Sequence, residues 1–349
     1  MEREYINNYI KNFLPYKSER WCYEDGILMN AVLELYLNTK EARYLDFVKS
    51  YFDLMIESNG NIKNYELEEF NIDNIAGGLA LVSLYDLTKE EKYKKACDLL
   101  YKQITQHPRT KENCFWHKKI YPNQVWMDGI YMGLVFYARY ISYFKVDDKG
   151  DIMNQLRLLR KNLYNEEKKL FVHAYDETRT MQWADMNTGM SHNVWSRACG
   201  WVAMALVDIY ETNIKDKEQI IPIYLDLING LKPHIKKGMI FQVVDCERYP
   251  GNYLETSGSA MVAYSLMKAY RLNMLDRKAF DLGLKVYNCI KKNYLKKDYD
   301  GYHLGGICRV AGLDNARRNG NIDYYLSEEI ALDEVKGVAP FILAYREQM

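Results

Sequence analysis

The sequence predicts an all-α protein, an (α/α)6 barrel in which residues 1–349 form a single domain. The first observation behind this prediction is a pattern that recurs six times, in which an acidic or polar residue near a glycine opens an apolar helical run. The six starts are Asp25-Gly26, Asp73, Asp128-Gly129, Arg197 with Gly200, Glu255 with Gly258, and Glu334 with Gly337. Six units in 349 residues average about 58 residues each, enough for two helices, and repeats of a few tens of residues form solenoids or closed rings.

The second observation is that two kinds of helix alternate. Trp201 to Val207 is apolar on every side, which is typical of a helix buried all round. In Glu91 to Ile104 the apolar residues recur every three or four positions, which is typical of a helix exposed on one side. An inner ring of apolar helices inside an outer ring of amphipathic ones is an α/α barrel. We expect the inner helices to begin on one face, where their first residues surround one mouth: Asp25, Asp73, Asp128, Arg197 and Glu255.

Composition and charge exclude several classes of function. The 47 basic and 47 acidic residues give a net charge of +0, so no overall field favours nucleic acid or an anionic membrane. The N-terminal MEREYINNYIKNF carries charges where a signal peptide needs an apolar core, and no apolar run reaches membrane-spanning length. The seven cysteines are scattered without a CxxC pair, which indicates reduced thiols. We therefore predict a cytoplasmic protein, a monomer or weak homodimer, that binds neither nucleic acid nor membranes.

Four long connections are predicted between the helices, and loops of that length in a compact fold usually carry function. They cover Thr105 to Asn123, Tyr164 to Val194, Lys237 to Leu254 and Tyr299 to Leu326. Their aromatic residues are suited to stacking on sugar rings and include Trp116, Tyr121, Tyr175, Trp183, Tyr249 and Tyr253. Tyrosine is abundant throughout, with 31 of 349 residues, so composition alone leaves a purely structural role for these rings equally open.

Several kinds of chemistry lack the residues they need. Cys114 and His117 have the spacing of metal ligands, but no second pair completes a site, so we expect neither a metal nor a cofactor. The sequence contains no nucleophile elbow and no glycine-rich phosphate loop. Carboxylates remain as the candidates for catalysis.

Asp128 is the strongest of these carboxylates. It stands between Trp126 and Tyr131, and apolar surroundings would raise the pKa of its carboxyl and suit it to general acid catalysis. The alternative is that Asp25, Asp73 and Asp128 only cap helices, which aspartate does well. For Asp25 we prefer the capping role.

Four separated motifs resemble those of one known family. They are Val125-Trp-Met-Asp-Gly-Ile-Tyr-Met132, Phe171-Val-His-Ala-Tyr-Asp176, Trp195-Ser-Arg-Ala-Cys-Gly-Trp201 and Tyr253-Leu-Glu-Thr-Ser-Gly-Ser259. In this order they are similar to motifs of the unsaturated rhamnogalacturonyl hydrolases of glycoside hydrolase family 105, which are similar in turn to the unsaturated glucuronyl hydrolases of family 88. The resemblance covers essentially the whole chain. It implies an (α/α)6 barrel and an intracellular glycosidase that needs no cofactor.

The resemblance also implies a substrate and a mechanism. The substrate is a short oligosaccharide with a 4,5-unsaturated uronic acid at its non-reducing end, such as a polysaccharide lyase leaves behind, and unsaturated galacturonyl-rhamnose is the expected form. In the implied reaction, protonation at C4 produces a cation at C5, water adds there, and the resulting hemiketal opens to expel the aglycone. One carboxyl group both donates the proton and accepts one from water.

The resemblance assigns roles to particular residues. It implies that Asp128 is the catalytic acid and base and that Asp73 is the second catalytic carboxylate. Arg197 is expected to pair with the uronate carboxylate through its planar guanidinium. Trp195 and Trp201 are expected to flank the sugar ring, and the other expected substrate contacts are His117, Trp126, Met132 and His173.

Two other functions remain open at this point. The first is an unsaturated glucuronyl hydrolase that acts on lyase products of glycosaminoglycans or ulvan, with the same catalytic residues and a different aglycone. The second is a sugar-binding or epimerase-type α/α barrel without hydrolytic activity. An epimerase is expected to have histidine at its catalytic centre, and Asp128 argues against it.

Overall fold

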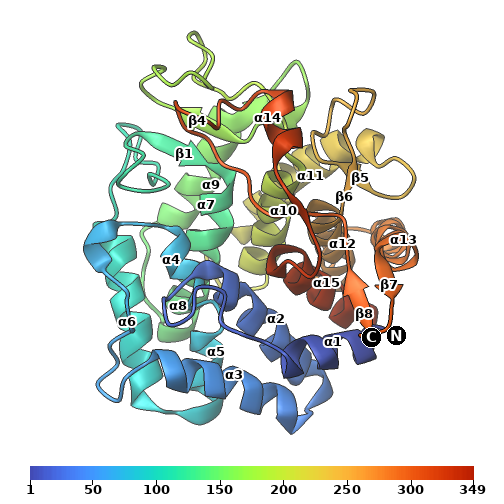
Figure 1. Ribbon diagram of the computed structural model, residues 1–349. Helices are drawn as coiled ribbons and strands as arrows, with labels where there is room; N and C mark the ends of the chain where they lie inside the picture. Colours follow the sequence, from blue (N-terminus) through green and yellow to red (C-terminus); the bar gives the residue numbers. More distant parts are fainter.

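Two concentric rings of helices make up the computed structural model, which describes residues 1–349 (Figure 1). The inner ring contains α2 (Tyr23–Thr39), α4 (Asp73–Ala76) with α5 (Leu81–Thr88), α7 (Met127–Gly129) with α8 (Val135–Phe144), α10 (Ser196–Tyr210), α12 (Thr256–Arg271) and α15 (Val335–Gln348). The outer ring contains α3 (Ala42–Met55), α6 (Glu91–Gln106), α9 (Asp151–Leu163), α11 (Ile220–Leu231), α13 (Arg277–Tyr294) and α1 (Glu2–Lys11). The predicted (α/α)6 barrel is confirmed.

The inner ring is closed. Each inner stretch packs against the next along the chain, and α15 packs against both α12 and α2. The sixth outer position is filled by α1, although the sequence pattern predicts each outer helix after its inner partner. Arg3 pairs with Glu41 at the start of α3, Glu2 pairs with Lys291 of α13, and the Tyr5 ring meets the Phe341 ring of α15 edge-on. The N-terminal helix therefore completes the outer ring.

Burial distinguishes the two rings as the sequence predicts. In α10 every residue from Ser196 to Ile209 is buried, because α10 has neighbours on all sides. In α6 the buried residues are the ones spaced by three and four, among them Tyr93, Cys97 and Leu100. The buried apolar residues of both rings form one contiguous core of 107 residues.

Two inner stretches are less regular than the pattern predicts. Between α4 and α5 the backbone hydrogen bonds join residues three apart instead of four, as from Gly78 N–H to the Ile75 carbonyl oxygen. The α-helix is therefore interrupted at Gly77 and Gly78. Directly after α7 the chain forms a π-helical turn, η2 (Ile130–Leu134). Such turns are rare and occur frequently at functional sites. This one immediately follows Asp128.

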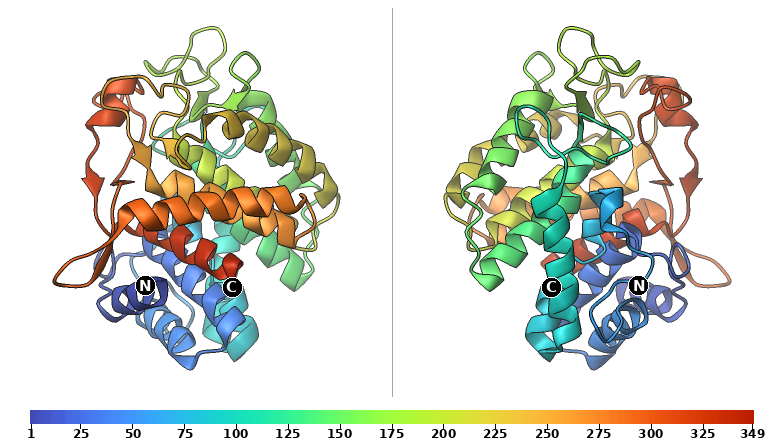
Figure 2. Two further views of the ribbon diagram at one scale, coloured as in Figure 1. Left: turned by 90° about the vertical axis from the view of Figure 1, so that its right-hand side faces the viewer. Right: turned by 90° about the vertical axis from the view of Figure 1, so that its left-hand side faces the viewer.

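Short strand pairs and helical turns in the loops were not predicted. The antiparallel pairs are β1 (Gln124–Trp126) with β4 (Ala174–Asp176), β2 (Tyr164–Asn165) with β3 (Leu170–Phe171), β5 (Ile240–Phe241) with β6 (Leu254–Glu255), β7 (Leu295–Lys297) with β8 (Tyr302–Leu304), and β9 (Ile307–Cys308) with β10 (Ile330–Ala331). The remaining elements are α14 (Ile322–Ser327) and the 3₁₀ turns η1 (Leu67–Glu69), η3 (Lys217–Gln219) and η4 (Lys232–His234). Figure 2 shows the segment between β9 and α14 running along one side of the molecule.

Neighbouring inner helices approach one another closely at glycines near their first turns. A Cβ on Gly26 of α2 would lie 2.2 Å from the Ala76 carbonyl oxygen and 2.4 Å from Gly77 Cα. A Cβ on Gly258 of α12 would lie 2.7 Å from the Ser196 carbonyl carbon of α10. These positions require glycine because backbone, and not a flexible side chain, occupies the space.

A network of buried charges joins inner helices at the opposite end of the barrel, near their last turns. Lys268 of α12 donates to Asp208 of α10 and pairs with Glu211, which directly follows α10, with 2.7 Å to an oxygen of each. Arg271 pairs with Glu211 and, through Nε at 2.8 Å, with Glu347 of α15. The side chains of Lys268, Asp208 and Glu347 are almost fully buried, so the ion pairs offset the cost of removing each charge from water.

None of the helices combines the length and the apolar composition needed to cross a bilayer.

The close approach at Gly26 predicts the effect of one added methyl group. Gly26→Ala should lower the free energy of unfolding by about 1–3 kcal/mol, because backbone atoms must move to admit the Cβ. Thermal unfolding of the purified variant measures the change. Gly305→Ala is the control, since its Cβ would meet the end of the Leu332 side chain at 3.2 Å and the nearest backbone atom, the Tyr294 carbonyl oxygen, only at 3.9 Å. Equal melting temperatures for the two variants would contradict the proposed backbone constraint.

Candidate active site

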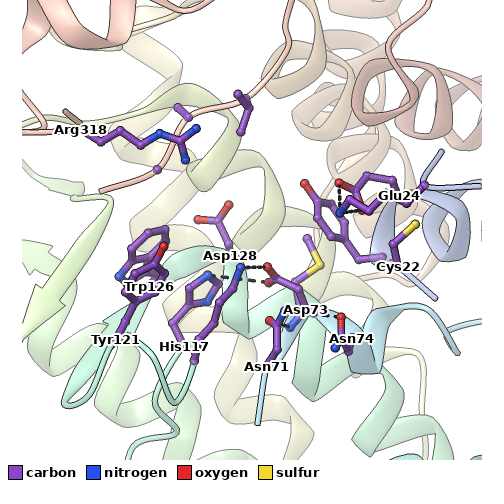
Figure 3. A pocket seen from close by; sticks show the side chains of 17 residues that line it. Cys22, Glu24, Asn71, Asp73, Asn74, His117, Tyr121, Trp126, Asp128 and Arg318 are labelled. Atoms are coloured by element: carbon purple, nitrogen blue, oxygen red, sulfur yellow. Dashed lines mark hydrogen bonds and ion pairs between the residues drawn. The ribbon is translucent and has the colours of Figure 1, made fainter. Parts of the chain in front are cut away.

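A cavity opens at the mouth of the barrel, where the inner helices begin (Figure 3). Its walls come from four separate parts of the chain: the start of α2 with the loop before it, the start of α4, the segment from the α6–β1 loop through η2, and the segment after β9. The lining residues are Lys17, Cys22, Tyr23, Glu24, Asn71, Asp73, Asn74, His117, Lys118, Tyr121, Trp126, Asp128, Met132, Val310, Ala311, Gly312 and Arg318.

Asp128 is placed by a strand pair. Trp126 of β1 lies opposite Ala174 of β4, and the Met127 N–H donates to the His173 carbonyl oxygen at 3.0 Å. This pairing brings the His173 ring beside α7, where His173 Nε2 lies 3.3 Å from Asp128 Oδ2 without forming an aligned hydrogen bond. The Asp128 side chain is 15% exposed, toward the cavity.

The apolar surroundings expected for Asp128 are only partly present. Trp126 lines the same cavity as Asp128, but the Tyr131 ring stacks on Trp201, with 5.0 Å between ring centres. The immediate polar neighbour of the Asp128 carboxyl is therefore His173.

Asp73 differs from Asp128 because a cation lies against it. Lys118 Nζ is 2.7 Å from Asp73 Oδ2, and His117 Nε2 is 3.8 Å from Oδ1. Burial opposes ionisation, but the Lys118 ammonium and then His117 hold the pKa of the Asp73 carboxyl below its ordinary value. The same pair raises the pKa of Lys118 against the effect of its burial. Asp73 is therefore a fixed negative charge in the cavity wall.

His117 stays uncharged. Burial lowers the pKa of its imidazole to about 4, although Asp73 acts in the opposite direction. Its backbone joins two parts of the site, because the His117 N–H donates to the Gln124 carbonyl and the His117 carbonyl accepts from Ile72 N–H. Gly129 of α7 lies beside the ring, and a Cβ there would be 3.5 Å from His117 Nδ1, an ordinary contact distance.

Aromatic rings form one wall. The rings of His117 and Trp126 lie 4.3 Å apart and nearly parallel, and Tyr121 lies parallel to Trp126 at 5.2 Å. The Trp126 indole N–H is directed to Gln124 Oε1 at 3.1 Å, which fixes the ring. Flat apolar faces of this kind bind sugar rings by stacking.

Arg318 lies above the Trp126 and Tyr121 rings in Figure 3, and its guanidinium points toward the middle of the cavity. The nearest carboxylate oxygen, Oε1 of Glu328, is 3.8 Å from it, beyond hydrogen-bond distance. The other two lining cations are closer to their partners: Lys118 pairs with Asp73, and Lys17 lies 2.9 Å from Glu24. Arg318 is thus the lining cation least committed to the protein itself.

The structure brings together five of the nine residues that the sequence assigned to the site. Asp128, Asp73, His117, Trp126 and Met132 all line the cavity.

The other four do not line the cavity. His173 lies behind Asp128, and Trp195 packs against His173 with 4.8 Å between ring centres. Trp201 is buried against Tyr131.

Arg197 requires a correction, because its guanidinium is buried in the wall of the barrel. It donates to the carbonyl oxygen of Cys308 and, at 3.3 Å, to Ser257 Oγ, and it lies 4.7 Å from the centre of the Trp195 ring. These contacts hold the strand β9 against α10 and α12. The expected pairing with a substrate carboxylate does not agree with this position.

Two other residues expected at the mouth also have internal roles. Asp25 was predicted to cap its helix, but it lies within the first turn of α2 and accepts hydrogen bonds from Tyr16 N–H and Tyr51 O–H. Glu255 is buried and does cap α12, since its carboxylate accepts from the N–H groups of Ser257 and Gly258. The mouth therefore gathers fewer charges than the repeat pattern predicts.

The sequence analysis missed Lys118, Arg318 and Tyr325. Lys118 directly follows His117, and a basic residue beside a candidate histidine was an available signal. Arg318 and Tyr325 belong to the long connection from Tyr299 to Leu326 that was predicted to be functional, but nothing in its sequence indicates which side chains turn inward.

Comparison with known proteins agrees with this architecture. The model of Glycosyl Hydrolase Family 88 matches residues 2–349. A solved structure of a family 105 glycoside hydrolase from C. acetobutylicum ATCC 824 superposes with a TM-score of 0.94 at 39% identity, covering 99% of this chain and 98% of that one. The unsaturated rhamnogalacturonyl hydrolase YesR of Bacillus subtilis (strain 168) is 22% identical over 267 residues, 72% of each protein. The unsaturated glucuronyl hydrolase of Bacillus sp. GL1 shares the fold, with a TM-score of 0.71 at 13% identity over 99% of this chain and 96% of that one.

The chain is a glycoside hydrolase with an α/α barrel. It belongs to the family 88 and 105 group of these enzymes, as the family model and the clostridial structure both show.

The burial of His117 predicts its titration. Its imidazole should remain neutral between about pH 5 and 8 and protonate with a midpoint near the pKa of about 4. His303 is the internal control, because its hydrogen bond to Asp333 raises its pKa above the ordinary value. NMR of the histidine ring resonances across this pH range measures the titration midpoints of His117 and His303. The His117→Asn variant assigns the His117 signal. A His117 midpoint above that of His303 would show that the ring is not buried as described.

Proposed function

We propose that this enzyme removes a 4,5-unsaturated uronic acid from the non-reducing end of oligosaccharides produced by polysaccharide lyases. Unsaturated galacturonyl-rhamnose is the preferred substrate in this proposal, which gives the enzyme a role in pectin degradation in the cytoplasm. The resemblance of its motifs to rhamnogalacturonyl hydrolases and the relationship to YesR support this choice.

The observation that carries the proposal is the contrast between the two carboxylates in one cavity. Asp73 is held ionised by Lys118, whereas Asp128 has no cation within ion-pair distance other than a histidine that is charged only if protonated. Two carboxyl groups in unequal surroundings are suited to unequal roles, one as a proton donor and one as a fixed negative charge.

In the proposed reaction Asp128 donates its proton to C4 of the unsaturated sugar. Positive charge then develops at C5 and the ring oxygen, where the fixed charge of Asp73 stabilises it electrostatically. Water adds to C5, and the Asp128 carboxylate accepts the proton that the water releases. The hemiketal opens and expels the aglycone. One water molecule is consumed and Asp128 returns to its starting protonation state.

Arg318 is the residue that we propose for recognition of the uronate carboxylate, in place of Arg197. Its guanidinium reaches the cavity and has no bidentate partner in the protein. A carboxylate on the substrate would accept two parallel hydrogen bonds from it. The stacked rings of Trp126 and Tyr121, which lie below Arg318 in Figure 3, would hold the sugar face.

An unsaturated glucuronyl hydrolase acting on glycosaminoglycan or ulvan lyase products is the second candidate. It would use the same cavity residues, and the two candidates differ only in the aglycone.

The proposal is tested by incubating the protein with lyase digests of rhamnogalacturonan, chondroitin and ulvan. Loss of the ultraviolet absorbance of the conjugated double bond reports turnover, and we expect the rhamnogalacturonan digest to react fastest. Asp128→Asn should fold normally and lose about two to four powers of ten in rate, the usual contribution of a general acid. Near-normal turnover by this variant would remove Asp128 from the acid role.

Isotope labels distinguish hydration from attack at the anomeric carbon. In D2O the product should carry deuterium at C4, and in H2-18O the heavy oxygen should enter at C5. Mass spectrometry of the product, taken before its keto group exchanges with solvent, reads both labels. A product with its double bond intact and the label at the anomeric carbon would contradict the mechanism.

Arg318→Met tests the charge recognition. We expect the KM for the unsaturated uronate to rise about 10- to 100-fold, because charged hydrogen bonds contribute about 1.5–3 kcal/mol. The KM for the methyl ester of the same substrate should be unchanged. Arg317→Met is the matched control, since Arg317 is exposed and does not line the cavity. An equal effect of Arg318→Met on acid and ester would show that Arg318 does not bind the carboxylate.

A further inference from the structure

His173 connects the catalytic carboxyl to the segment that follows β9. Its Nδ1 lies 2.7 Å from the hydroxyl oxygen of Tyr325 in α14, and its Nε2 lies 3.3 Å from Asp128 Oδ2. His173 and Tyr325 are completely buried, and Trp195 packs against both of their rings. The Tyr325 hydroxyl, the His173 ring and the Asp128 carboxyl therefore form a row that ends at the cavity.

The direction of the hydrogen bond between Tyr325 and His173 follows from burial. The Tyr325 hydroxyl has no hydrogen-bonding partner other than His173. If the hydroxyl only accepted a hydrogen bond from Nδ1–H, its own proton would be buried without an acceptor, which is unfavourable. The hydroxyl therefore donates to Nδ1. A neutral imidazole carries one ring proton, so that proton resides on Nε2 and faces Asp128.

This tautomer matters for the position of the acidic proton on Asp128. Oδ2 is buried 3.3 Å from Nε2 of His173, so a proton on Oδ2 would lie close to the Nε2–H, although the two groups are not aligned as a hydrogen bond. The side chain is nevertheless partly exposed to the cavity, which leaves Oδ1 as the oxygen directed toward a substrate. With the opposite tautomer, the bare Nε2 would draw the acidic proton to Oδ2, away from the substrate.

We propose that Tyr325 is a positioning residue that fixes the tautomer of His173 and thereby directs the acidic proton of Asp128 to Oδ1. The catalytic part of this inference rests on the proposed function, whereas the tautomer follows from the fold alone. α14 is held in place independently, because Gln242 Nε2 donates to the Tyr325 carbonyl oxygen at 3.1 Å. Replacement of the hydroxyl should therefore leave the helix where it is.

Tyr325→Phe is the variant that tests the proposal. It keeps the ring and removes the hydroxyl, so we expect kcat to fall about 10- to 100-fold, part of the contribution of a general acid, while KM stays within about twofold. Tyr224→Phe is the matched control, since Tyr224 is also fully buried and its hydroxyl bonds only to Ser265, between α11 and α12. The control should retain the wild-type kcat. An unchanged kcat in Tyr325→Phe, or equal losses in both variants, would overturn the catalytic part of the proposal.

The tautomer itself is measured by NMR of the protein labelled with 15N-histidine. The protein has six histidines. We expect the wild-type His173 ring to carry its proton on Nε2 and its Nδ1 resonance to show an accepted hydrogen bond. Tyr325→Phe should move the Nδ1 resonance to that of a nitrogen without this hydrogen bond or release a fraction of the Nδ1–H form, and His173→Gln identifies the signals. A wild-type ring protonated on Nδ1, or an Nδ1 resonance and a tautomer both unaffected by Tyr325→Phe, would overturn the proposal. If no unsaturated uronide is turned over by the wild-type enzyme, the proposed function fails, and these spectra still decide the role of Tyr325.

Discussion

The close contact between neighbouring inner helices near their first turns is the constraint on which the rest of the structure depends. At Gly26 and Gly258 the backbone of one inner helix nearly touches the backbone of the next segment, and no side chain fits between them. Both contacts lie on the side of the ring where the inner helices begin. On the same side Asp73 of α4 and Asp128 of α7 share one cavity, although more than 50 residues separate them in the chain.

Buried polar residues occur at both ends of the barrel. At the far end Lys268 and Arg271 are paired with carboxylates of α10 and α15, and these pairs tie the helices together. At the mouth several buried polar atoms have no hydrogen-bonding partner in the protein: Asp73 Oδ1, His117 Nδ1, Asp128 Oδ2 and His173 Nε2. Unsatisfied buried groups are unfavourable for folding. Three of these residues, Asp73, His117 and Asp128, line the cavity, and buried atoms without a partner also occur at the far end, at Asp208 Oδ2 and Arg346 Nε.

The sequence was sufficient for the architecture and for about half of the site. The repeated helix starts predict the ring. A helix that is apolar on every side must be buried on every side, and an inner ring enclosed by outer helices provides that burial. The helix starts do not predict which of their polar residues remain accessible to solvent. Arg197 and Asp128 occupy equivalent positions in the repeat, yet β9 covers Arg197 and leaves Asp128 accessible. That difference depends on the path of a segment more than 100 residues further along the chain.

Loop residues were the least predictable for the same reason. Arg318 and Tyr325 have no periodic pattern, and each reaches the site only because the segment after β9 returns across the mouth. By contrast, Trp126 belongs to the motif around Asp128, and His117 was assigned to the site through the resemblance to known hydrolases. The resemblance to known hydrolases identified His173 but not the hydroxyl behind it.

The position of α1 in the sixth outer place has a consequence for how the protein is made. The inner ring closes only when α15 packs between α12 and α2, and α1 packs against both α15 and the helices on either side. During synthesis on the ribosome, the apolar surfaces of α2 and α12 that face α15 stay uncovered until Val335–Gln348 has emerged. Exposed surfaces of this kind promote aggregation of partly made chains. The architecture that places Asp73 and Asp128 in one cavity thus also makes the nascent chain dependent on α15.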